Sequence, residues 1–505
     1  MKTLLILILL TAPFVASLHA SLQLASPFTD HMVLQRDQAV PVWGWCDTGE
    51  KVEVRFGDQV VKTTSDAEGQ WRVDLKPLKA SFDAETLAVS TASGERVELQ
   101  DVVVGEVWIC SGQSNMQFAV NSVPEIKALI PTAKNIRTFE VKRMVAFDEQ
   151  ARCEGSWETS IPSSAVAFSF AYMLEAKADV PVGIILTSWG SSSLEAWMPR
   201  DMVETVPHFK TIMDEFDADQ ETRSKIESIL NGRQPWSRSD DVFLRRQTNI
   251  LYNAMMHPLA PFACRGLVWY QGERNTQSMH GLVEAPFYSR NNSGMLKYGD
   301  TLKQWITRYR QEWENDAMHF LVVMLPGYGK SINGGPSSEP DSPVAHSWAW
   351  IRESQLKALD LDHVGVSNSI DLGDIKNVHP KDKLPIGERL ALLAARDTLG
   401  QAVVAEGPEM SEVVKTNDSL IVHFENAAGL STSDGAMPTG FWVSDKSGKW
   451  VRATAKIDGG TVVLRSEEIN KPLYVRYAFA GYPKVNLVNG AGLPAYPFRT
   501  DSFAP

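Results

Sequence analysis

The chain has 505 residues, of which 44% are hydrophobic, so it can bury an extensive core and lacks the composition of a disordered protein. Acidic residues outnumber basic ones by 61 to 49, the formal net charge is -12, and no stretch concentrates basic side chains. This balance excludes nucleic acid as the main partner, because binding to phosphate backbones requires a basic face. At roughly 150 residues per domain, the length predicts about three structural units.

The first twenty residues have the layout of a signal peptide. Lys2 is followed by the unbroken apolar run Leu4–Leu10 and then by small residues around Ala16 and Ala20. This run is too short to span a bilayer, and no later stretch reaches the roughly 20 consecutive apolar residues of a membrane helix. We therefore expect residues 1–20 to be a signal peptide, and the mature chain to be exported to the periplasm or the extracellular space without a membrane span.

The cysteines give no sign of a metal site. Cys46, Cys110, Cys153 and Cys264 stand far apart and have no zinc-ligand spacing. An exporting compartment permits disulfides, and nothing in the sequence selects among the three possible pairings. Cys110 lies within an apolar strand pattern and is expected to be a buried small side chain. We expect neither a metal ion nor a cofactor.

Residues 21–100 have an all-β pattern. Short runs, several of them alternating apolar with polar residues, are separated by turn-forming residues, and they comprise Val40–Trp45, Val52–Phe56, Trp71–Leu75 and Leu87–Ser90. This spacing predicts a small N-terminal β-sandwich domain.

Residues 101–400 alternate apolar strands with helical patterns. The strand patterns are Val102–Cys110, Val182–Thr187, Gly266–Tyr270 and Phe320–Leu325. The helical patterns are Ala165–Lys177, Val203–Leu230, Asp300–Trp313 and Gly387–Thr398. Strands without alternation are typical of parallel sheets covered on both faces, so an α/β domain is predicted here. A β pattern returns in residues 401–505, as in Leu420–Phe424 and Leu473–Tyr477, and predicts a C-terminal β-rich domain.

Reactive side chains follow several of these strands. In a parallel sheet covered by helices, active residues gather on the loops beyond the carboxyl ends of the strands. Ser114 follows the first strand on a Gly-Gln turn, Gly190 follows the second, and Asn275 follows the third. His379 lies on a later loop with acidic residues upstream and is a candidate base for a serine hydroxyl. Each residue alone has an ordinary structural explanation, whereas the combination indicates acyl transfer.

The motifs around these residues resemble a known family. Gly112–Met116, Trp269–Asn275 and His379–Lys383, with Gly387–Leu390, are similar to the sialate O-acetylesterase-like branch of the SGNH (GDSL) hydrolases, bacterial type. The resemblance implies a three-layer sandwich with a parallel central sheet, flanked by the N- and C-terminal β-rich segments. It further implies Ser114 as nucleophile and His379 as general base. The oxyanion donors it implies are the backbone N–H groups of Ser114 and Gly190 and the side chain of Asn275.

The orienting acid is the point at which the sequence departs from this family. Many SGNH hydrolases have an aspartate three residues before the catalytic histidine, whereas this chain has Lys376. We predict Asp374 as the third catalytic residue, with Asp371 or a backbone carbonyl as alternatives. For substrate binding we predict polar residues of the same motifs, namely Gln113, Gln271 and Glu273, of which Glu273 also positions its loop.

The sequence predicts a serine esterase that removes O-acetyl groups from carbohydrate, with O-acetylated sialic acids as the leading substrate. Acetylxylan or another acetylated plant polysaccharide is an alternative substrate, and a non-catalytic glycan-binding protein is an alternative of a different class. Four aromatic residues near the motifs are candidates to stack on a sugar ring, namely Trp189, Trp197, Trp269 and Tyr270. For Trp269 and Tyr270 the alternative is a place in the core of their strand.

Overall fold

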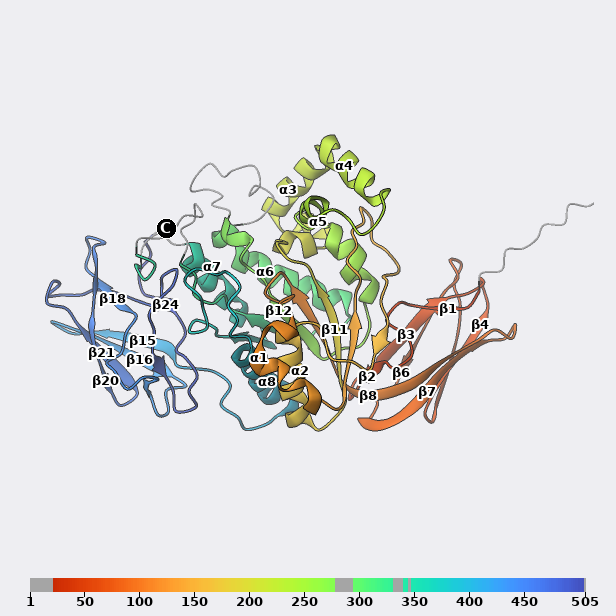
Figure 1. Ribbon diagram of the computed structural model, residues 1–505, viewed down its shortest axis with the longest axis horizontal. Helices are drawn as coiled ribbons and strands as arrows, with labels where there is room; N and C mark the ends of the chain where they lie inside the picture. Colours follow the sequence, from red (N-terminus) through yellow and green to blue (C-terminus); the bar gives the residue numbers. More distant parts are fainter. Residues whose placement is uncertain (1–20, 278–293, 330–338, 344–346, 504–505) are drawn as a thin grey trace, which may run out of the picture.

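The computed structural model describes residues 21–277, 294–329, 339–343 and 347–503 (Figure 1). The predicted signal peptide, residues 1–20, lies outside the described residues. An N-terminal β-rich part, a central α/β part and a C-terminal β-rich part follow one another along the long axis of the molecule (Figure 1). None of the helices in these ranges is long and apolar enough to cross a membrane.

The N-terminal part consists of two antiparallel layers of strands. One layer has the order β1 (Gln23–Leu24), β3 (Val40–Trp45) and β6 (Gln70–Leu75). The other contains β4 (Lys51–Phe56), β5 (Gln59–Thr64), β7 (Ser81–Thr91) and the first half of β8 (Arg96–Gly112). Buried residues alternate with half-buried or exposed ones along β3, β4 and β6, so each strand directs one face toward the space between the layers.

Strand β8 connects the N-terminal part to the central sheet. Its first residues alternate in exposure and pair antiparallel with β7, whereas every residue from Val102 to Gly112 is buried. There it pairs in parallel with β2 (Val33–Gln35), β11 (Val182–Ser188) and β12 (Gly266–Tyr270). β8 thus runs through the boundary predicted at residue 100, and the two parts share a strand.

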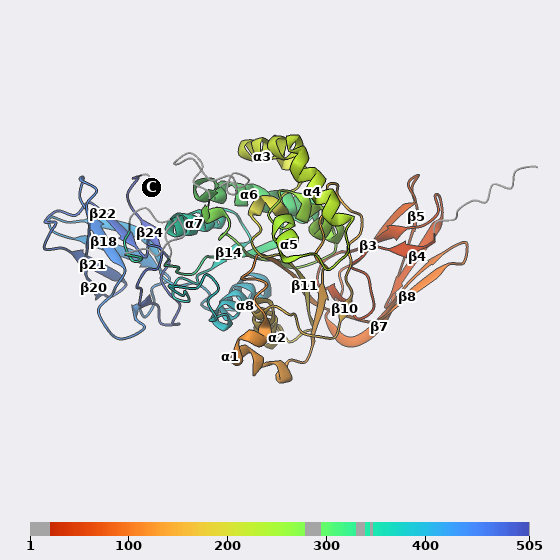
Figure 2. The same ribbon diagram turned by 45° about the horizontal axis from the view of Figure 1, so that its top comes forward.

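The central part is a three-layer α/β/α sandwich. Its sheet has the order β10 (Trp157–Glu158), β9 (Ile136–Glu140), β11, β8, β12, β13 (His319–Val323) and β14 (Val364–Ser367), and is parallel from β9 to β14. Helices α1 (Pro124–Lys127), α2 (Ala165–Ala178) and α8 (Leu384–Leu399) cover one face, and α6 (Gly294–Glu312) and α7 (Ser347–Leu356) cover the other (Figure 2).

Three further helices lie beside α6: α3 (Pro207–Ala218), α4 (Gln220–Leu230) and α5 (Arg238–Leu244) (Figure 2). The sequence predicts one helical stretch over 203–230, and the structure interrupts it at Asp219. This residue leaves the helical conformation, and its carboxylate accepts the Thr222 N–H at 2.9 Å. An aspartate in this position caps a new helix, which is why α3 and α4 are separate.

The C-terminal part is antiparallel. One sheet has the order β15 (Glu409–Lys415), β16 (Leu420–Glu425), β21 (Thr461–Arg465) and β20 (Thr454–Asp458). Another has the order β19 (Trp450–Arg452), β18 (Phe441–Ser444), β22 (Tyr474–Tyr477) and β24 (Phe498–Arg499), and β17 (Ser431–Thr432) pairs with β23 (Leu487–Val488).

The last segment of the chain returns to the central sheet. The Tyr496 hydroxyl donates to the carbonyl of Val366 in β14 at 2.6 Å. The Asn368 amide donates to the carbonyls of Pro494 and Ala495 at 2.9 and 3.1 Å. The C-terminal segment therefore fastens the end of β14, the outermost strand of the path that begins at β10.

Candidate active site

The loops that carry the candidate residues emerge at the carboxyl end of the central sheet. β8 lies between β11 and β12, so the loops of Ser114, Gly190 and Asn275 start side by side. The loop of His379 starts at the end of β14 and crosses toward β8 before α8 begins. The sheet topology thus gathers residues that lie far apart in the sequence.

The turn after β8 depends on a glycine. Gly112 has a φ of +137°, and a Cβ atom there would overlap the carbonyl oxygen of Tyr270 on β12. The Gln113 N–H donates to that same carbonyl at 3.0 Å, and the Met116 N–H closes the turn onto the Gln113 carbonyl at 2.9 Å. This close approach presents the half-buried Ser114 at the end of the strand.

Ser114 and His379 are in direct contact. The His379 Nε2 atom lies 2.7 Å from the Ser114 Oγ atom, although 265 residues separate them in the sequence. Burial, together with the nearby Lys383 ammonium, holds the pKa of His379 below its usual value. At neutral pH the imidazole is therefore uncharged and can accept the serine proton.

The two candidate orienting acids bind other groups. Asp374 accepts the backbone N–H groups of Lys376 and Asn377 at 2.8 and 3.0 Å. Asp371 forms an ion pair with Arg389 at 2.7 Å. Within the described ranges no carboxylate forms a hydrogen bond with the His379 ring. Asp374 instead shapes the turn before His379, and its role as third catalytic residue stays a prediction.

A buried polar cluster lies behind the serine and the histidine. The Asn115 amide donates to the Glu273 carboxylate and, at 3.0 Å, to the Val378 carbonyl, while Lys383 Nζ donates to the Asn115 Oδ1 atom at 2.6 Å. Burial lowers the pKa of Lys383 and raises that of Glu273. Because Asn115 follows Ser114 and Val378 precedes His379, the cluster ties the two loops together.

The sequence motifs include Asn115 and Lys383 but do not reveal their roles. The sequence offers one signal for these roles: Asn115 and Lys383 stand within the motifs that carry Ser114 and His379. In the structure Lys383 is fully buried and lies over the rings of Phe118 and Tyr270, with its Nζ atom 5.3 and 5.2 Å from the ring centres. A cation in such surroundings is costly unless paired, which indicates a purpose beyond packing.

The predicted backbone oxyanion donors, Ser114 and Gly190, differ in whether their N–H groups already have an acceptor. The Ser114 N–H has no acceptor among the described residues. The Gly190 N–H donates to the Gln117 Oε1 atom at 2.6 Å, and a Cβ atom at Gly190 would lie only 3.2 Å from the Cβ atom of Ser114. The backbone of Gly190 thus lies close to Ser114, but the Gln117 Oε1 atom occupies the position to which the Gly190 N–H donates.

Asn275 is fully buried, and both ends of its amide are hydrogen-bonded. Its Oδ1 atom accepts the Leu194 N–H at 3.1 Å and the Gln271 Nε2 group at 2.9 Å, and its Nδ2 group donates to the Glu195 carboxylate at 3.1 Å. In this structure the amide fastens the β12 loop to the segment after Gly190. Its role as an oxyanion donor stays a prediction.

The residues predicted to bind substrate lie beneath the surface. Gln113, Gln271 and Glu273 are at most 5% exposed. The Gln271 amide donates to Gln113 Oε1 at 3.2 Å and to the Ser192 carbonyl at 3.1 Å. The structure places these residues where they hold the loops in position, and none presents its side chain to solvent.

The aromatic residues near the motifs are also buried. Trp189, Trp197, Trp269 and Tyr270 have exposed fractions of 0%. Trp189 stacks on Trp236 with ring centres 6.1 Å apart and donates to Asp241 at 3.1 Å. The structure places all four residues in the core, which was the alternative for Trp269 and Tyr270 and was not expected for Trp189 and Trp197. The described ranges also contain no cluster of three or more histidine, cysteine, aspartate or glutamate side chains that could hold a metal ion.

Known proteins share this architecture. Residues 104–395 match the family model described as carbohydrate esterase, sialic acid-specific acetylesterase. The chain is 25% identical to sialate O-acetylesterase of Rattus norvegicus over 91% of this chain and 90% of that protein. It is 24% identical to sialate O-acetylesterase of Homo sapiens over 91% and 88%. The crystal structure of a carbohydrate acetylesterase from Xanthomonas citri superimposes with a TM-score of 0.80 at 29% identity, covering 95% of this chain and 100% of that one.

Proposed function

Because the chain belongs to the sialic acid-specific acetylesterase family of carbohydrate esterases, we propose that Ser114 and His379 perform its acetylester hydrolysis, with O-acetylated sialic acids as substrates. The observation that carries the assignment of the two residues is the 2.7 Å contact between His379 Nε2 and Ser114 Oγ. The sialic acid substrate is supported by the similarity to the rat and human enzymes, which extends over nearly the whole chain.

In the proposed first step, His379 accepts the Ser114 proton while Oγ attacks the acetyl carbonyl carbon. The resulting oxyanion is stabilised by the backbone N–H of Ser114, and by the N–H of Gly190 once the carbonyl oxygen replaces the Gln117 Oε1 atom as its acceptor. His379 then donates its proton to the sugar oxygen, the ester bond breaks, and the deacetylated sugar leaves.

In the proposed second step, His379 accepts a proton from water, which attacks the acetyl group on Ser114. The second tetrahedral intermediate uses the same N–H donors. Its collapse returns the proton to Oγ, releases acetate and regenerates the free serine. The lowered pKa of His379 supports this cycle, because the imidazole has to be uncharged at the start of each step.

The first experiment compares Ser114→Ala with the wild type on p-nitrophenyl acetate. We expect kcat/KM to fall at least about 10³-fold, because the nucleophile is removed. Ser122→Ala, which changes an exposed serine nearby, is the matched control and should retain activity. Equal turnover by Ser114→Ala would exclude this nucleophile, and no turnover by the wild type would favour a glycan-binding protein without catalysis.

The second experiment tests the substrate. Acetate release from 9-O-acetylated sialic acid is compared with release from acetylxylan at equal acetyl concentration. We expect kcat/KM to be higher for the sialic acid. A higher value for acetylxylan would retain the esterase mechanism and overturn the sialic acid assignment.

A further inference from the structure

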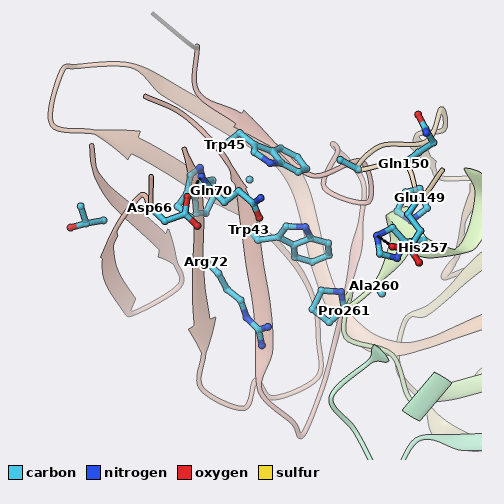
Figure 3. Close-up of a pocket in the computed structure, with 15 residues that line it drawn as sticks. Trp43, Trp45, Asp66, Gln70, Arg72, Glu149, Gln150, His257, Ala260 and Pro261 are labelled. Carbon is cyan, nitrogen blue, oxygen red and sulfur yellow. Dashed lines mark hydrogen bonds and ion pairs between the residues drawn. The ribbon is translucent and has the colours of Figure 1, made fainter. Parts of the chain in front are cut away.

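A crevice of about 670 Å³ opens between the N-terminal part and the central part (Figure 3). Strands β3 and β6 form one wall, and the segment from His257 to Pro261 belongs to the other. This segment precedes β12, so the crevice lies at the amino ends of the central strands, whereas Ser114 and His379 lie at the carboxyl ends. The volume is within the range of about 300–1,000 Å³ that is usual for ligand sites.

The β-sheet wall presents two indoles on one face. Residues of β3 alternate between buried and half-buried, so Trp43 and Trp45 point to the same side, away from the core of the N-terminal part. On the neighbouring strand β6, Arg72 lies opposite Trp43, and Gln70 lies opposite Trp45. Figure 3 shows both indoles reaching from the sheet toward the opposite wall.

The indoles are held in place from the sides. Trp43 packs edge-to-face against Phe28, with ring centres 4.9 Å apart. The Arg152 guanidinium lies 5.5 Å from the centre of the Trp45 ring and is itself anchored by a hydrogen bond to the Leu24 carbonyl at 3.0 Å. Aromatic surfaces ordered before binding lose little conformational entropy when a ligand stacks on them.

The charged groups of the crevice favour a neutral ligand. Arg72 donates to both carboxylate oxygens of Glu314 at 2.8 and 2.9 Å, and His257 is 2.8 Å from Glu312. Glu314 thus neutralises Arg72, and Glu312 offsets any charge on His257. Asp66 and Glu149 add two negative charges to the lining, against the one positive charge of Arg152 beside Trp45, so the negative charges are in excess. An anionic sugar would be repelled here.

We propose that this crevice binds a neutral glycan chain at a site separate from the ester-hydrolysing residues. The flat C–H face of a pyranose ring stacks on an indole, and its hydroxyls bond to carboxamides and carboxylates. The Gln70 carboxamide, beside both indoles, forms no hydrogen bond within the described residues and offers a donor and an acceptor. Binding in the crevice holds the enzyme on a polymeric glycan. The site at the carboxyl end of the central sheet, with Ser114 and His379, stays free to bind the acetylated sugar.

Affinity gel electrophoresis of the full chain tests the proposal. The gels contain deacetylated xylan or galactan as neutral probes, or polysialic acid as an anionic probe, and none of the probes contains an ester for the enzyme to cleave. We expect a neutral probe to retard the wild type. Trp45→Ala should weaken this binding at least about tenfold, as expected for the loss of a stacked aromatic surface.

Two further variants keep the test decisive. Gln70→Ala removes a side chain without hydrogen bonds in the described residues, so it should fold normally and weaken binding about three- to tenfold. Trp442→Ala on β18 is the matched control, because this half-buried indole also lies under an arginine, Arg452, at 4.4 Å. Its binding should equal that of the wild type.

Several outcomes would overturn the proposal. One is that no neutral probe retards the wild type, and another is that polysialic acid retards it more strongly than the neutral probes do. A third is that Trp45→Ala and Trp442→Ala weaken binding to the neutral probe equally. Because the probes carry no acetyl groups, these outcomes leave the proposed ester hydrolysis untouched.

Discussion

A lysine ammonium close to the His379 ring affects the proton on that ring directly. Burial is the larger cause of the lowered pKa of His379, and the charge of Lys383, which is buried beside the two loops, lowers it further by disfavouring the imidazolium form. The benefit is a larger fraction of uncharged base at a given pH. The cost is a buried cation, which the Asn115 oxygen and the Glu273 carboxylate partly offset.

Lys383→Met is expected to raise the pKa of His379. The plot of kcat/KM against pH rises as the imidazole loses its proton, so the midpoint of this rise should move to higher pH in the variant. Lys381→Met, which removes an exposed lysine of the same motif, is the control and should leave the midpoint in place. A variant with lower activity and an unmoved midpoint would show that Lys383 acts only on the shape of the loops.

Asp374→Asn separates the two possible roles of this carboxylate. A carboxylate that orients a catalytic histidine contributes about 10⁴ in kcat, whereas a carboxylate that accepts two backbone N–H groups shapes a turn. An asparagine oxygen can accept the same bonds, so we expect kcat within about threefold of the wild type. His379→Ala is measured for comparison, and its kcat should fall at least about 10³-fold. A loss of similar size in Asp374→Asn would confirm the prediction that Asp374 is the third catalytic residue.

At the scale of the element, β8 decides where the nucleophile lies. Its buried half stands between two parallel neighbours, and the chain leaves the sheet at Gly112, where the backbone almost touches Tyr270. The φ of Gly112 and the crowding together demand a residue without a Cβ atom. The turn, and with it Ser114, therefore depends on the spacing between β8 and β12.

Gly112→Ala is expected to lower the free energy of unfolding by at least about 3 kcal/mol, because backbone strain adds to overlap with the Tyr270 carbonyl. Gly94→Ala is the matched control: its φ of +100° is also unfavourable for alanine, but a Cβ atom there would meet nothing within 4 Å. This control should lose about 1 kcal/mol. Urea denaturation of both variants measures the difference, and equal losses would contradict the role given to the close approach.

The elements illustrate what a sequence can and cannot predict. The run Val102–Cys110 predicts a strand buried on both faces, because only such a strand needs no alternation, and the structure buries all of it. The motifs predict the two loops of Ser114 and His379. The hydrogen-bond partners of buried polar groups could not be predicted from the sequence. Asn275, for example, donates to Glu195, 80 residues away, and no local pattern marks that pair.

At the scale of the whole molecule, the N-terminal and central parts are joined by more than a linker. They share β8, and the Glu106 carboxylate is completely buried where they meet. Arg36 donates to it at 2.6 Å from the segment after β2, and Arg265 donates at 3.0 Å from the segment before β12. We therefore expect the two parts to unfold in one cooperative transition.

Glu106→Gln is expected to destabilise both parts together by about 3 kcal/mol, because two arginines lose the carboxylate between them. Glu98 lies on the exposed half of the same strand and forms an ion pair with Arg96 at the surface, so Glu98→Gln should change stability by less than about 1 kcal/mol. Urea unfolding is followed by tryptophan fluorescence and by circular dichroism. Two separate transitions in the wild type, or a Glu106→Gln effect no larger than that of Glu98→Gln, would contradict the coupling.

The contacts of the C-terminal segment with β14 have a consequence for biosynthesis. Tyr496 lies 130 residues after Val366 in the sequence, so the ribosome adds it, with Pro494 and Ala495, long after the strand that these residues fasten. A nascent chain can complete its N-terminal part early, while the end of β14 stays uncovered until residues 494–496 have been synthesised. A premature stop before residue 494 would therefore release a chain with nearly every motif of the ester-hydrolysing centre but with an open sheet edge, prone to aggregation.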